Sequence, residues 1–453
     1  MIYQEAFDLF AKESPVTVML RGMLENIFSA ERLDELFREN ALRQHEDHLL
    51  FSTVVDLMGL VVAQVRPTVH AAYQKRKEHV SVTIKAVYDK LNGVETQVCR
   101  ALVSQNADHL RKLLLAMKAP LPDLLPGYRT KILDGNHLRR TQRRLKALRQ
   151  INGAPLPGQA LVVLDPALML AVDVFPCEDA HAQERSILPK VLETVHPGDL
   201  WIADRNFCTA GFLCGIDERE GAFVIRQHGQ LPATPLGEPK RRGRCSTGMV
   251  YEQWVTVLDA EDQPRQFRRI TVRLDEPTRN GETEIHILTN LPKRIAARRI
   301  AEIYQKRWTI EAVFGEVAAS LQGEVETLAY PRAALFAFCI ALSMYNLLSV
   351  IRAAVRVAHK VRQETISCYY LAEEIATTYR GMMIAVPRSY WHKRFASLTV
   401  PQMAAALLAL AKSVCLSQYR KHPRGPKKPP LRKFSKKGRN HVSTQRVLEQ
   451  ATT

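Results

Sequence analysis

The stretch Tyr304-Gln-Lys-Arg-Trp-Thr-Ile-Glu311 lies in a helical run that the sequence predicts from about Arg298 to Leu321. At 100° per residue, Tyr304, Arg307 and Glu311 fall within about 60° of one another, so one helix face would carry a phenol, a guanidinium and a carboxylate. An exposed amphipathic face with an Arg/Glu pair at i, i+4 has the same spacing. The spacing alone leaves a surface salt bridge and a functional site both open.

Two aspartates upstream favour the functional interpretation, because each ends a short apolar run typical of a buried strand. The runs are Lys131-Ile-Leu-Asp134 and Leu200-Trp-Ile-Ala-Asp204. Hard divalent cations take oxygen ligands, and a two-metal site needs carboxylates that bridge and flank the ions. Two strand-end aspartates and the helix glutamate Glu311 could therefore hold two magnesium ions.

With these residues in place, the sequence resembles the DDE transposases of the insertion-sequence-four type, whose signature is Tyr-x2-Arg-x3-Glu-x6-Lys. Tyr304, Arg307 and Glu311 match that spacing, whereas Ala318 occupies the lysine position. The resemblance covers roughly residues 49–349. Its supporting segments follow the family's order: Asp134-Gly-Asn-His-Leu138, Ala203-Asp-Arg-Asn-Phe207 and Leu288-Thr-Asn-Leu-Pro292.

The resemblance implies a transposase that binds the terminal inverted repeats of an insertion sequence and moves it by metal-dependent DNA strand cleavage and strand transfer. Asp134, Asp204 and Glu311 would be the catalytic residues and would hold two Mg²⁺ ions, which Mn²⁺ could replace. Tyr304 and Arg307 would contact DNA phosphates. The implied partner is double-stranded DNA, as transposon ends and as target, bound by a homodimer.

Two other functions remain open at this point. A ribonuclease-H-like nuclease would use the same three carboxylates without needing paired DNA ends. A catalytically decayed DNA-binding protein is the second, and Ala318 in place of the signature lysine favours it. The sequence does not specify the terminal repeat, the target site, the oligomeric state, a hairpin intermediate or the effect of Ala318 on activity.

Charge and composition agree with a nucleic-acid partner. The 453 residues include 64 Lys and Arg against 46 Asp and Glu, a net charge of +18 that favours binding to a polyanion. The eight cysteines show no paired spacing, which indicates reduced thiols in a cytoplasmic, nucleoid-associated protein. The N-terminus lacks the pattern of a signal peptide. Residues 333–351 are uncharged, and we expect a buried core helix there rather than a membrane span.

The order of expected elements predicts an α/β fold with a ribonuclease-H-like catalytic domain. Strands are expected at 130–133, 160–164 and 169–175, then a helix at 180–195, a strand at 200–203, a helix at 210–219, a strand at 222–226 and the final signature helix. We expect four regions: an N-terminal helical DNA-binding domain (1–122), the catalytic domain (123–332) with a β-rich insertion at about 228–291, a C-terminal helical region (333–417) and a basic disordered tail (418–453). Residues 66–91 resemble a helix-turn-helix, although an ordinary helical bundle fits them equally well.

Basic residues gather in three further places; DNA contact and solvated charge explain the first about equally well, and the third would add sequence-independent affinity for DNA. They are residues 139–149 after the first aspartate, a loop at 240–244, and the tail from Arg420 to Arg439. The other carboxylates of the catalytic region, Asp165, Asp173 and Glu178-Asp179, are interpreted as structural. His137 could line the cleft beside Asp134, although a histidine where a strand meets a loop is more often a hydrogen-bonded loop residue.

Overall fold

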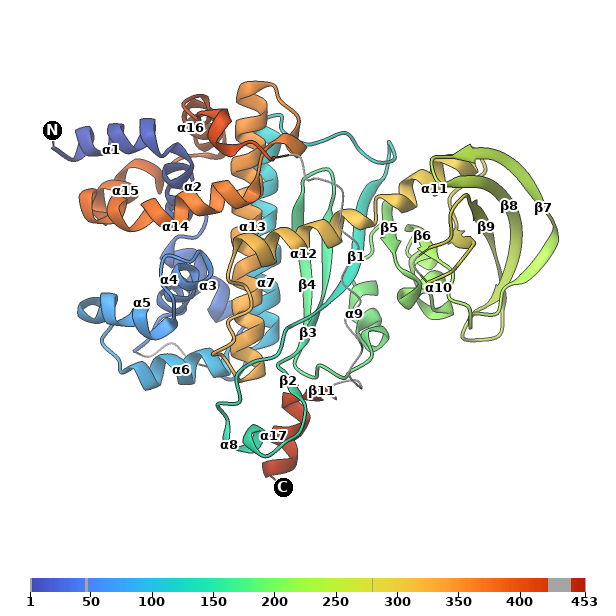
Figure 1. The fold of residues 1–453 in the computed structure, drawn as a ribbon, viewed down its shortest axis with the longest axis horizontal. Coiled ribbons are helices and arrows are strands. Elements are labelled where there is room, and N and C mark those ends of the chain that lie inside the picture. The colour runs from blue at the N-terminus through green and yellow to red at the C-terminus, as the bar shows by residue number, and fades with distance from the viewer. Residues whose placement is uncertain (1, 45–47, 279, 423–440, 453) are drawn as a thin grey trace.

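Strand β1 (Arg129–His137) carries Asp134 and lies inside a nine-stranded mixed sheet of order β4-β3-β1-β5-β6-β10-β9-β8-β7. The computed structural model of the chain describes residues 2–44, 48–278, 280–422 and 441–452 (Figure 1). The remaining strands of this sheet are β3 (Gln159–Asp165), β4 (Leu170–Cys177), β5 (Asp199–Ala203), β6 (Ala222–Arg226), β7 (Thr234–Cys245), β8 (Gly248–Leu258), β9 (Pro264–Leu274) and β10 (Glu284–Thr289).

The five strands from β4 to β6 have the order and directions of a ribonuclease-H-like sheet, in agreement with the expected α/β fold. β1 pairs antiparallel with β3 and parallel with β5, and β5 pairs parallel with β6. Side chains alternate between two cores, with Ile132 in one and Leu133 in the other. Asp134 is therefore on the Ile132 side of the sheet, which is the side that helix α12 (Trp308–Ser320) contacts.

The insertion between β6 and the signature region is β-rich and extends the same sheet. β10 pairs antiparallel with β6, so β10, β9, β8 and β7 continue the sheet beyond β6 (Figure 1). Residues 240–244 lie on strand β7 rather than in the loop that their basic composition suggested. Pairing with β8 supplies their backbone partners, and two bulges with Gly237 and Gly243 at positive φ let this edge strand bend.

Helices from both ends of the chain pack together beside the sheet (Figure 1). Thr17 donates its N–H and hydroxyl to Glu374 at 2.8 Å, and Arg21 donates to the Tyr379 hydroxyl at 3.0 Å. Residues 1–122 and 333–417 therefore share one hydrophobic core. The helices are α1 (Ile2–Glu13), α2 (Pro15–Asn26), α3 (Ala30–Asn40), α4 (Phe51–Val62), α5 (Val69–Arg76), α6 (Ile84–Gly93), α7 (Thr96–Ala116), α13 (Pro331–His359), α14 (Cys368–Ala385), α15 (Arg388–Phe395) and α16 (Val400–Lys412).

Helix α13 is the centre of this helical layer and contacts α2, α4, α7, α16 and β4. It is the one single helix in the described residues that is long and apolar enough to cross a membrane, and its most apolar 18-residue window is entirely buried in the protein. The expectation of a core helix at 333–351 is therefore confirmed. Asn346, fully buried within it, exchanges two 2.8 Å hydrogen bonds with the backbone of Ala171 and so fixes α13 against β4.

Two expected elements differ from the structure. The helix expected at 180–195 is reduced to a 3₁₀ turn (Glu184–Ile187) and the short α9 (Leu188–Leu192), because Pro189 cannot donate the hydrogen bond that a continuous helix needs. The tail expected to be disordered from 418 is ordered at its end, where β11 (His441–Ser443) pairs with β2 (Ala154–Leu156) and precedes α17 (Thr444–Thr452). The middle of that tail, 423–440, lies outside the described residues.

Arg268 on β9 joins the insertion to the segment that leads into helix α11 (Ala297–Gln305). Its side chain is 1% exposed, pairs with Glu252 at 2.7 Å and donates to the carbonyls of Leu291, Pro292 and Ile295 at 2.8–2.9 Å. We expect Arg268→Met to lower the free energy of unfolding by about 3–5 kcal/mol, because three backbone carbonyls lose their donor and Glu252 loses one of its two arginine partners. Chemical denaturation monitored by tryptophan fluorescence measures this loss.

The matched control for that measurement is Arg273→Met on the same strand. Arg273 is 55% exposed and pairs with Glu284 at the surface, so its loss should cost less than about 1 kcal/mol. Equal losses for the two variants would contradict the assigned role of Arg268.

Candidate active site

Asp134 and Asp204 lie next to each other on neighbouring parallel strands. The register of β1 and β5 pairs Leu133 with Ala203, and each aspartate is the next residue along its strand. Asp134 accepts the N–H of Gly135 at 2.9 Å, and Asp204 accepts the N–H of Arg205 at the start of a 3₁₀ turn. The two aspartates therefore follow paired residues of adjacent strands.

The signature segment reaches the aspartates as two helices rather than one. α11 ends at Gln305 and α12 begins at Trp308, with Lys306 and Arg307 between them. Hydrogen bonds from Arg307 N–H to the Tyr304 carbonyl (3.0 Å) and from Ile310 N–H to the Arg307 carbonyl (3.2 Å) span three residues, so the chain turns more tightly here than in an α-helix. The continuous helix expected from Arg298 to Leu321 is therefore wrong at its centre.

The guanidinium of Arg307 bridges two of the three predicted carboxylates. Its Nη1 lies 3.1 Å from Asp134 Oδ2 and its Nη2 lies 2.8 Å from Glu311 Oε1. Arg307 is 5% exposed, whereas the Glu311 side chain is 40% exposed. The i, i+4 pair that sequence spacing left open is thus formed, and it extends to the first aspartate.

The charges at this site perturb one another. Burial raises the pKa of Asp134 to about 6 against the opposing effects of Arg307 and the Gly135 N–H, and the nearby charges of Glu311 and Asp204 raise it further. Burial acts to lower the pKa of Arg307, but Tyr304, Asp204 and Asp134 outweigh it and hold that pKa above its usual value. The site therefore combines three acids and one permanent cation.

Tyr304 is 8% exposed and lies beside Arg307, at the end of α11. Burial raises the pKa of its phenol to about 12, with Asp204 adding to the effect, so the hydroxyl stays protonated at neutral pH and can donate a hydrogen bond. Trp308, the next residue after Arg307, is 60% exposed, and the guanidinium lies 4.7 Å from its ring centroid. The signature segment thus places a hydrogen-bond donor, a cation and an exposed aromatic ring together.

Glu184 contacts the residues next to the two aspartates, Gly135 and Asn206, and no sequence pattern predicts this. Its Oε2 accepts a hydrogen bond from the Asn206 amide, and its Oε1 lies where a side chain on Gly135 would begin, 1.8 Å from an ideal Cβ. His137 Nδ1 is 3.9 Å from the same carboxylate. A side chain at 135 would therefore require Glu184 to move, and His137 lies near Glu184, on the side of the sheet opposite Asp134.

The donor set fits hard divalent cations, because it consists of carboxylate oxygens and because its negative charges repel one another. Asp134, Asp204 and Glu311 would hold the ions. Within the described residues, no three Asp, Glu, His or Cys side chains lie close enough together to enclose a metal ion, and Arg307 occupies the space between Asp134 and Glu311. Arg307 therefore supplies the compensating positive charge in the arrangement seen here.

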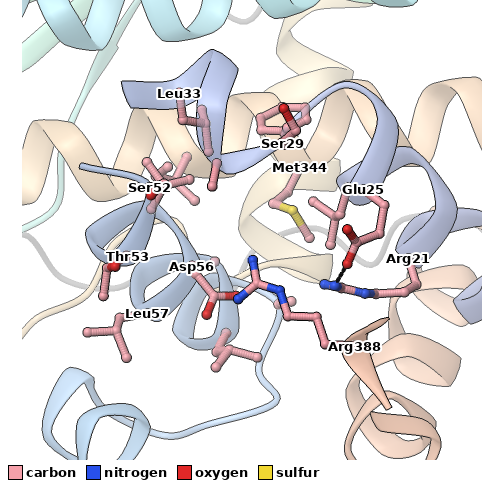
Figure 2. A pocket seen from close by; sticks show the side chains of 18 of the residues that line it. Arg21, Glu25, Ser29, Leu33, Ser52, Thr53, Asp56, Leu57, Met344 and Arg388 are labelled. Atoms are coloured by element: carbon pink, nitrogen blue, oxygen red, sulfur yellow. Dashed lines mark ion pairs between the residues drawn. The ribbon is translucent and has the colours of Figure 1, made fainter. Parts of the chain in front are cut away.

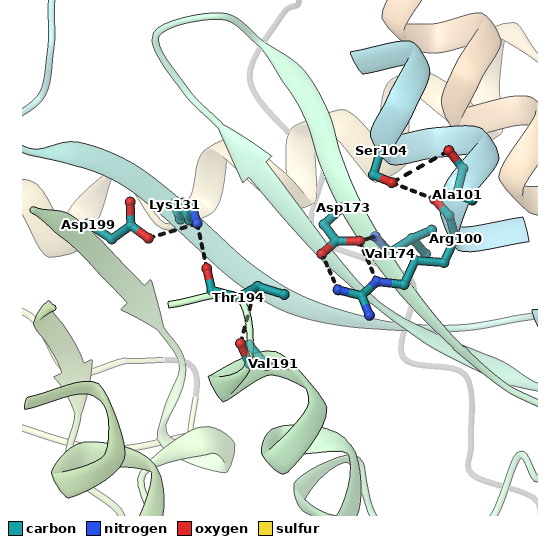
Figure 3. Close-up of polar contacts among 9 residues, drawn as sticks. All are labelled: Arg100, Ala101, Ser104, Lys131, Asp173, Val174, Val191, Thr194 and Asp199. Carbon is teal, nitrogen blue, oxygen red and sulfur yellow. Dashed lines mark hydrogen bonds and ion pairs between the residues drawn. The ribbon is translucent and has the colours of Figure 1, made fainter. Parts of the chain in front are cut away.

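The competing carboxylates have structural partners, as expected. Asp173 binds both Nε and Nη2 of Arg100 at 2.9 Å, which ties β4 to α7 (Figure 3). Asp165 accepts the N–H groups of Ala167 and Leu168 at 2.9 and 3.0 Å in a turn. Asp179 accepts the N–H of His181 and pairs with Arg446. These contacts explain the three aspartates without a catalytic role.

A pocket of about 280 Å³ lies in the helical layer, apart from the carboxylates (Figure 2). Helices α2, α3, α4 and α13 line it, and none of Asp134, Asp204 and Glu311 does. Two ion pairs, Arg21 with Glu25 and Arg76 with Asp56, compensate charges on its wall. This pocket is therefore separate from the candidate active site.

The raised pKa of Asp134 predicts a pH-dependent effect on stability. The pKa of this carboxyl is near 3.8 in the unfolded chain and about 6 in the folded protein, so its contribution to stability falls as pH rises from about 4 to 6. Asp134→Asn removes that unfavourable ionisation. We expect the variant to be more stable than the wild type by about 2–3 kcal/mol at pH 7.5, without divalent metal, and about equal to it at pH 3.5.

The two proteins are compared by urea unfolding at both pH values. The difference in unfolding free energy between variant and wild type should grow with pH, because only the wild type must ionise a buried carboxyl. A difference that is the same at pH 3.5 and pH 7.5 would contradict the raised pKa.

Comparison with known proteins bears on the same region. A family model described as a transposase DDE domain matches residues 125–347, which is just under half of the chain. The matched region begins just before β1 and ends inside α13, so it contains both aspartates, the insertion and the signature segment. A search of curated proteins found no match. The region that holds the site is similar to a transposase DDE domain, which supports the identification of this chain as a DDE transposase.

Proposed function

We propose that the chain is a transposase of the insertion-sequence-four type that binds the terminal inverted repeats of its element and cuts and joins DNA strands with divalent metal. The observation that carries this proposal is the meeting of Asp134, Asp204, Arg307 and Glu311 from two neighbouring strands and one helix. The match to a transposase DDE domain over the same residues supports it.

In the proposed reaction the three carboxylates hold two Mg²⁺ ions, or Mn²⁺ in their place. When bound, such ions activate an attacking water or 3′-hydroxyl and stabilise the leaving oxygen of the phosphodiester. Arg307 presents a planar, permanently charged donor suited to a phosphate, and the protonated Tyr304 hydroxyl donates a hydrogen bond to one. Burial of both side chains keeps these donors fixed in direction.

The net charge of +18 and the exposed edge strand β7 support DNA as the partner. Lys240 and Arg241 on β7 have no carboxylate partner within the part of the chain that the structure describes, whereas Arg242 and Arg244 pair with Glu252 and Asp275. In the proposed function, a homodimer binds the paired DNA ends in the cytoplasm, at the nucleoid.

The triad assignment predicts three inactive variants. Asp134→Ala, Asp204→Ala and Glu311→Ala should each reduce cleavage of the cognate ends to background, because each removes ligands that a two-metal site needs. Specific DNA binding should persist in a gel-shift assay, since the phosphate donors remain.

The control for this set is Asp165→Asn, which keeps an oxygen for the N–H groups of Ala167 and Leu168 and should cleave at the wild-type rate. Wild-type cleavage by any one of the three alanine variants would remove that residue from the triad.

The substitution Ala318→Lys restores the lysine of the family signature and tests what its absence changes. Ala318 is exposed on α12, so a lysine there meets no steric obstacle. A lysine can hold a phosphate but cannot replace a metal ligand, so we expect the native chain to be catalytic and Ala318→Lys to bind DNA ends about 10-fold more tightly. Parallel binding and cleavage assays with Mg²⁺ or Mn²⁺ measure both quantities.

An inert native protein beside an active Ala318→Lys variant would reverse this conclusion and favour a decayed copy. Cleavage of DNA without any requirement for terminal repeats would instead favour a ribonuclease-H-like nuclease.

A further inference from the structure

A basic segment, defined here as residues 139–149, follows β1 directly and carries more unpaired positive charge than its surroundings. It contains no acidic residue. Of its six cations, Arg139 alone pairs with a carboxylate in the described parts of the chain, binding Glu324 at 3.3 Å. The six are Arg139, Arg140, Arg143, Arg144, Lys146 and Arg149, and all are exposed. Such a cluster of positive charge attracts a polyanion. The alternative is that water alone solvates it.

The segment is held in place by its backbone and is not a free run of charge. The N–H of Gln142 donates to the Glu326 carbonyl at 2.8 Å, and the N–H of Thr141 donates to the Pro155 carbonyl of β2 at 3.0 Å. Leu148, on the short helix α8 (Lys146–Arg149), is 1% exposed. These contacts fix the arginines between the loop that follows α12 and strand β2.

The C-terminal hook, defined here as residues 441–452, forms the outer support of this segment (Figure 1). Its strand β11 pairs in parallel with β2, in the register His441 with Ala154 and Ser443 with Leu156. Its helix α17 contacts α8. Arg446 fastens the hook to the catalytic region through Asp179 at 2.6 Å. The chain thus returns from its helical layer to cover the underside of the basic segment.

The position of the segment links it to the site. Arg140 is six residues beyond Asp134 along the same strand direction, roughly 20 Å for extended chain. Glu324 and Glu326, which anchor the segment, follow the end of α12, the helix that carries Glu311. At its other end Arg144 lies close enough to Tyr88 of α6 to oppose the rise in that tyrosine's pKa, which burial causes. The surface therefore runs from the carboxylates to the N-terminal helices.

We infer that the C-terminal hook holds the basic segment as a docking surface for the phosphate backbone of double-stranded DNA beside the carboxylates. The inference rests on the proposed function, because it names the surface that receives the DNA next to the cleavage site. Arginine side chains on a fixed backbone lose less conformational freedom on binding than the same side chains on a free chain. The hook supplies that order in advance, so the segment needs no DNA to fold.

The test measures DNA binding by the full-length protein without metal, so that cleavage plays no part. Arg140→Ala/Lys146→Ala removes two exposed cations whose side chains form no hydrogen bond or ion pair within the described residues. Affinity for a fluorescent duplex should fall about five- to tenfold per lost phosphate contact at 0.1 M salt, and the slope of log K against log salt should become shallower by about 1.8. The matched control Arg111→Ala/Lys112→Ala, two exposed cations on α7, should leave both quantities unchanged.

Two further variants test the hook itself. Deletion of residues 441–453 should weaken binding and flatten the salt slope as the double alanine variant does, and combining the two changes should add little, because both remove the same surface. Arg446→Gln, which breaks the link to Asp179 but keeps the whole chain, should weaken binding in the same direction. Thermal unfolding of each variant confirms that the rest of the protein is folded.

The outcomes separate this inference from the proposed function. Wild-type affinity and salt slope in Arg140→Ala/Lys146→Ala, or in Arg446→Gln together with the hook deletion, would overturn the inference while leaving cleavage by the carboxylates untouched. A protein that binds through this segment yet never cleaves DNA with Mg²⁺ or Mn²⁺ would count against the proposed function and support the docking surface.

Discussion

One buried guanidinium, that of Arg307, determines how the site of this protein is organised. A cation that is 5% exposed must find charged partners, and three carboxylates brought together need a positive charge between them. Arg307 meets both requirements by bridging Asp134 on the sheet and Glu311 on α12. The tight turn between α11 and α12 lies at the same residue, so the direction of α12 and the position of this cation are set together.

The sheet gives that cation fixed partners because its strands are held from both sides. Asn346 of α13 bonds the backbone of β4 on one face, while Glu184 occupies the space above Gly135 on the other. Lys131 joins β1 to the start of β5 through Asp199 at 2.8 Å (Figure 3). These contacts link the strands that carry the two aspartates to each other and to the layers on both faces of the sheet.

The exposed charges around the site are mainly positive, because the nearby acids are paired with arginines. The edge strand β7 and the basic segment present exposed lysine and arginine side chains, whereas the acids near the carboxylates are engaged: Glu282 pairs with Arg226, and Asp179 pairs with Arg446. The helices from the two ends of the chain share one core with the face of the sheet on which Asp134 lies.

The sequence alone determined the strand-end aspartates and the long apolar core helix, because apolar periodicity is a local property, whereas the parallel pairing of β1 with β5 was decided by the fold. It also placed Arg307 and Glu311 at bonding distance, since i, i+4 spacing implies it.

Tertiary structure decided the features that no local sequence pattern contains. The strand at 240–244 exists because β8 pairs with it. Glu184 approaches Gly135 only once the chain has folded over the sheet. The return of residues 441–452 to β2 has the same cause, because pairing between residues so distant in sequence is decided by the packed fold and not by the composition of either segment.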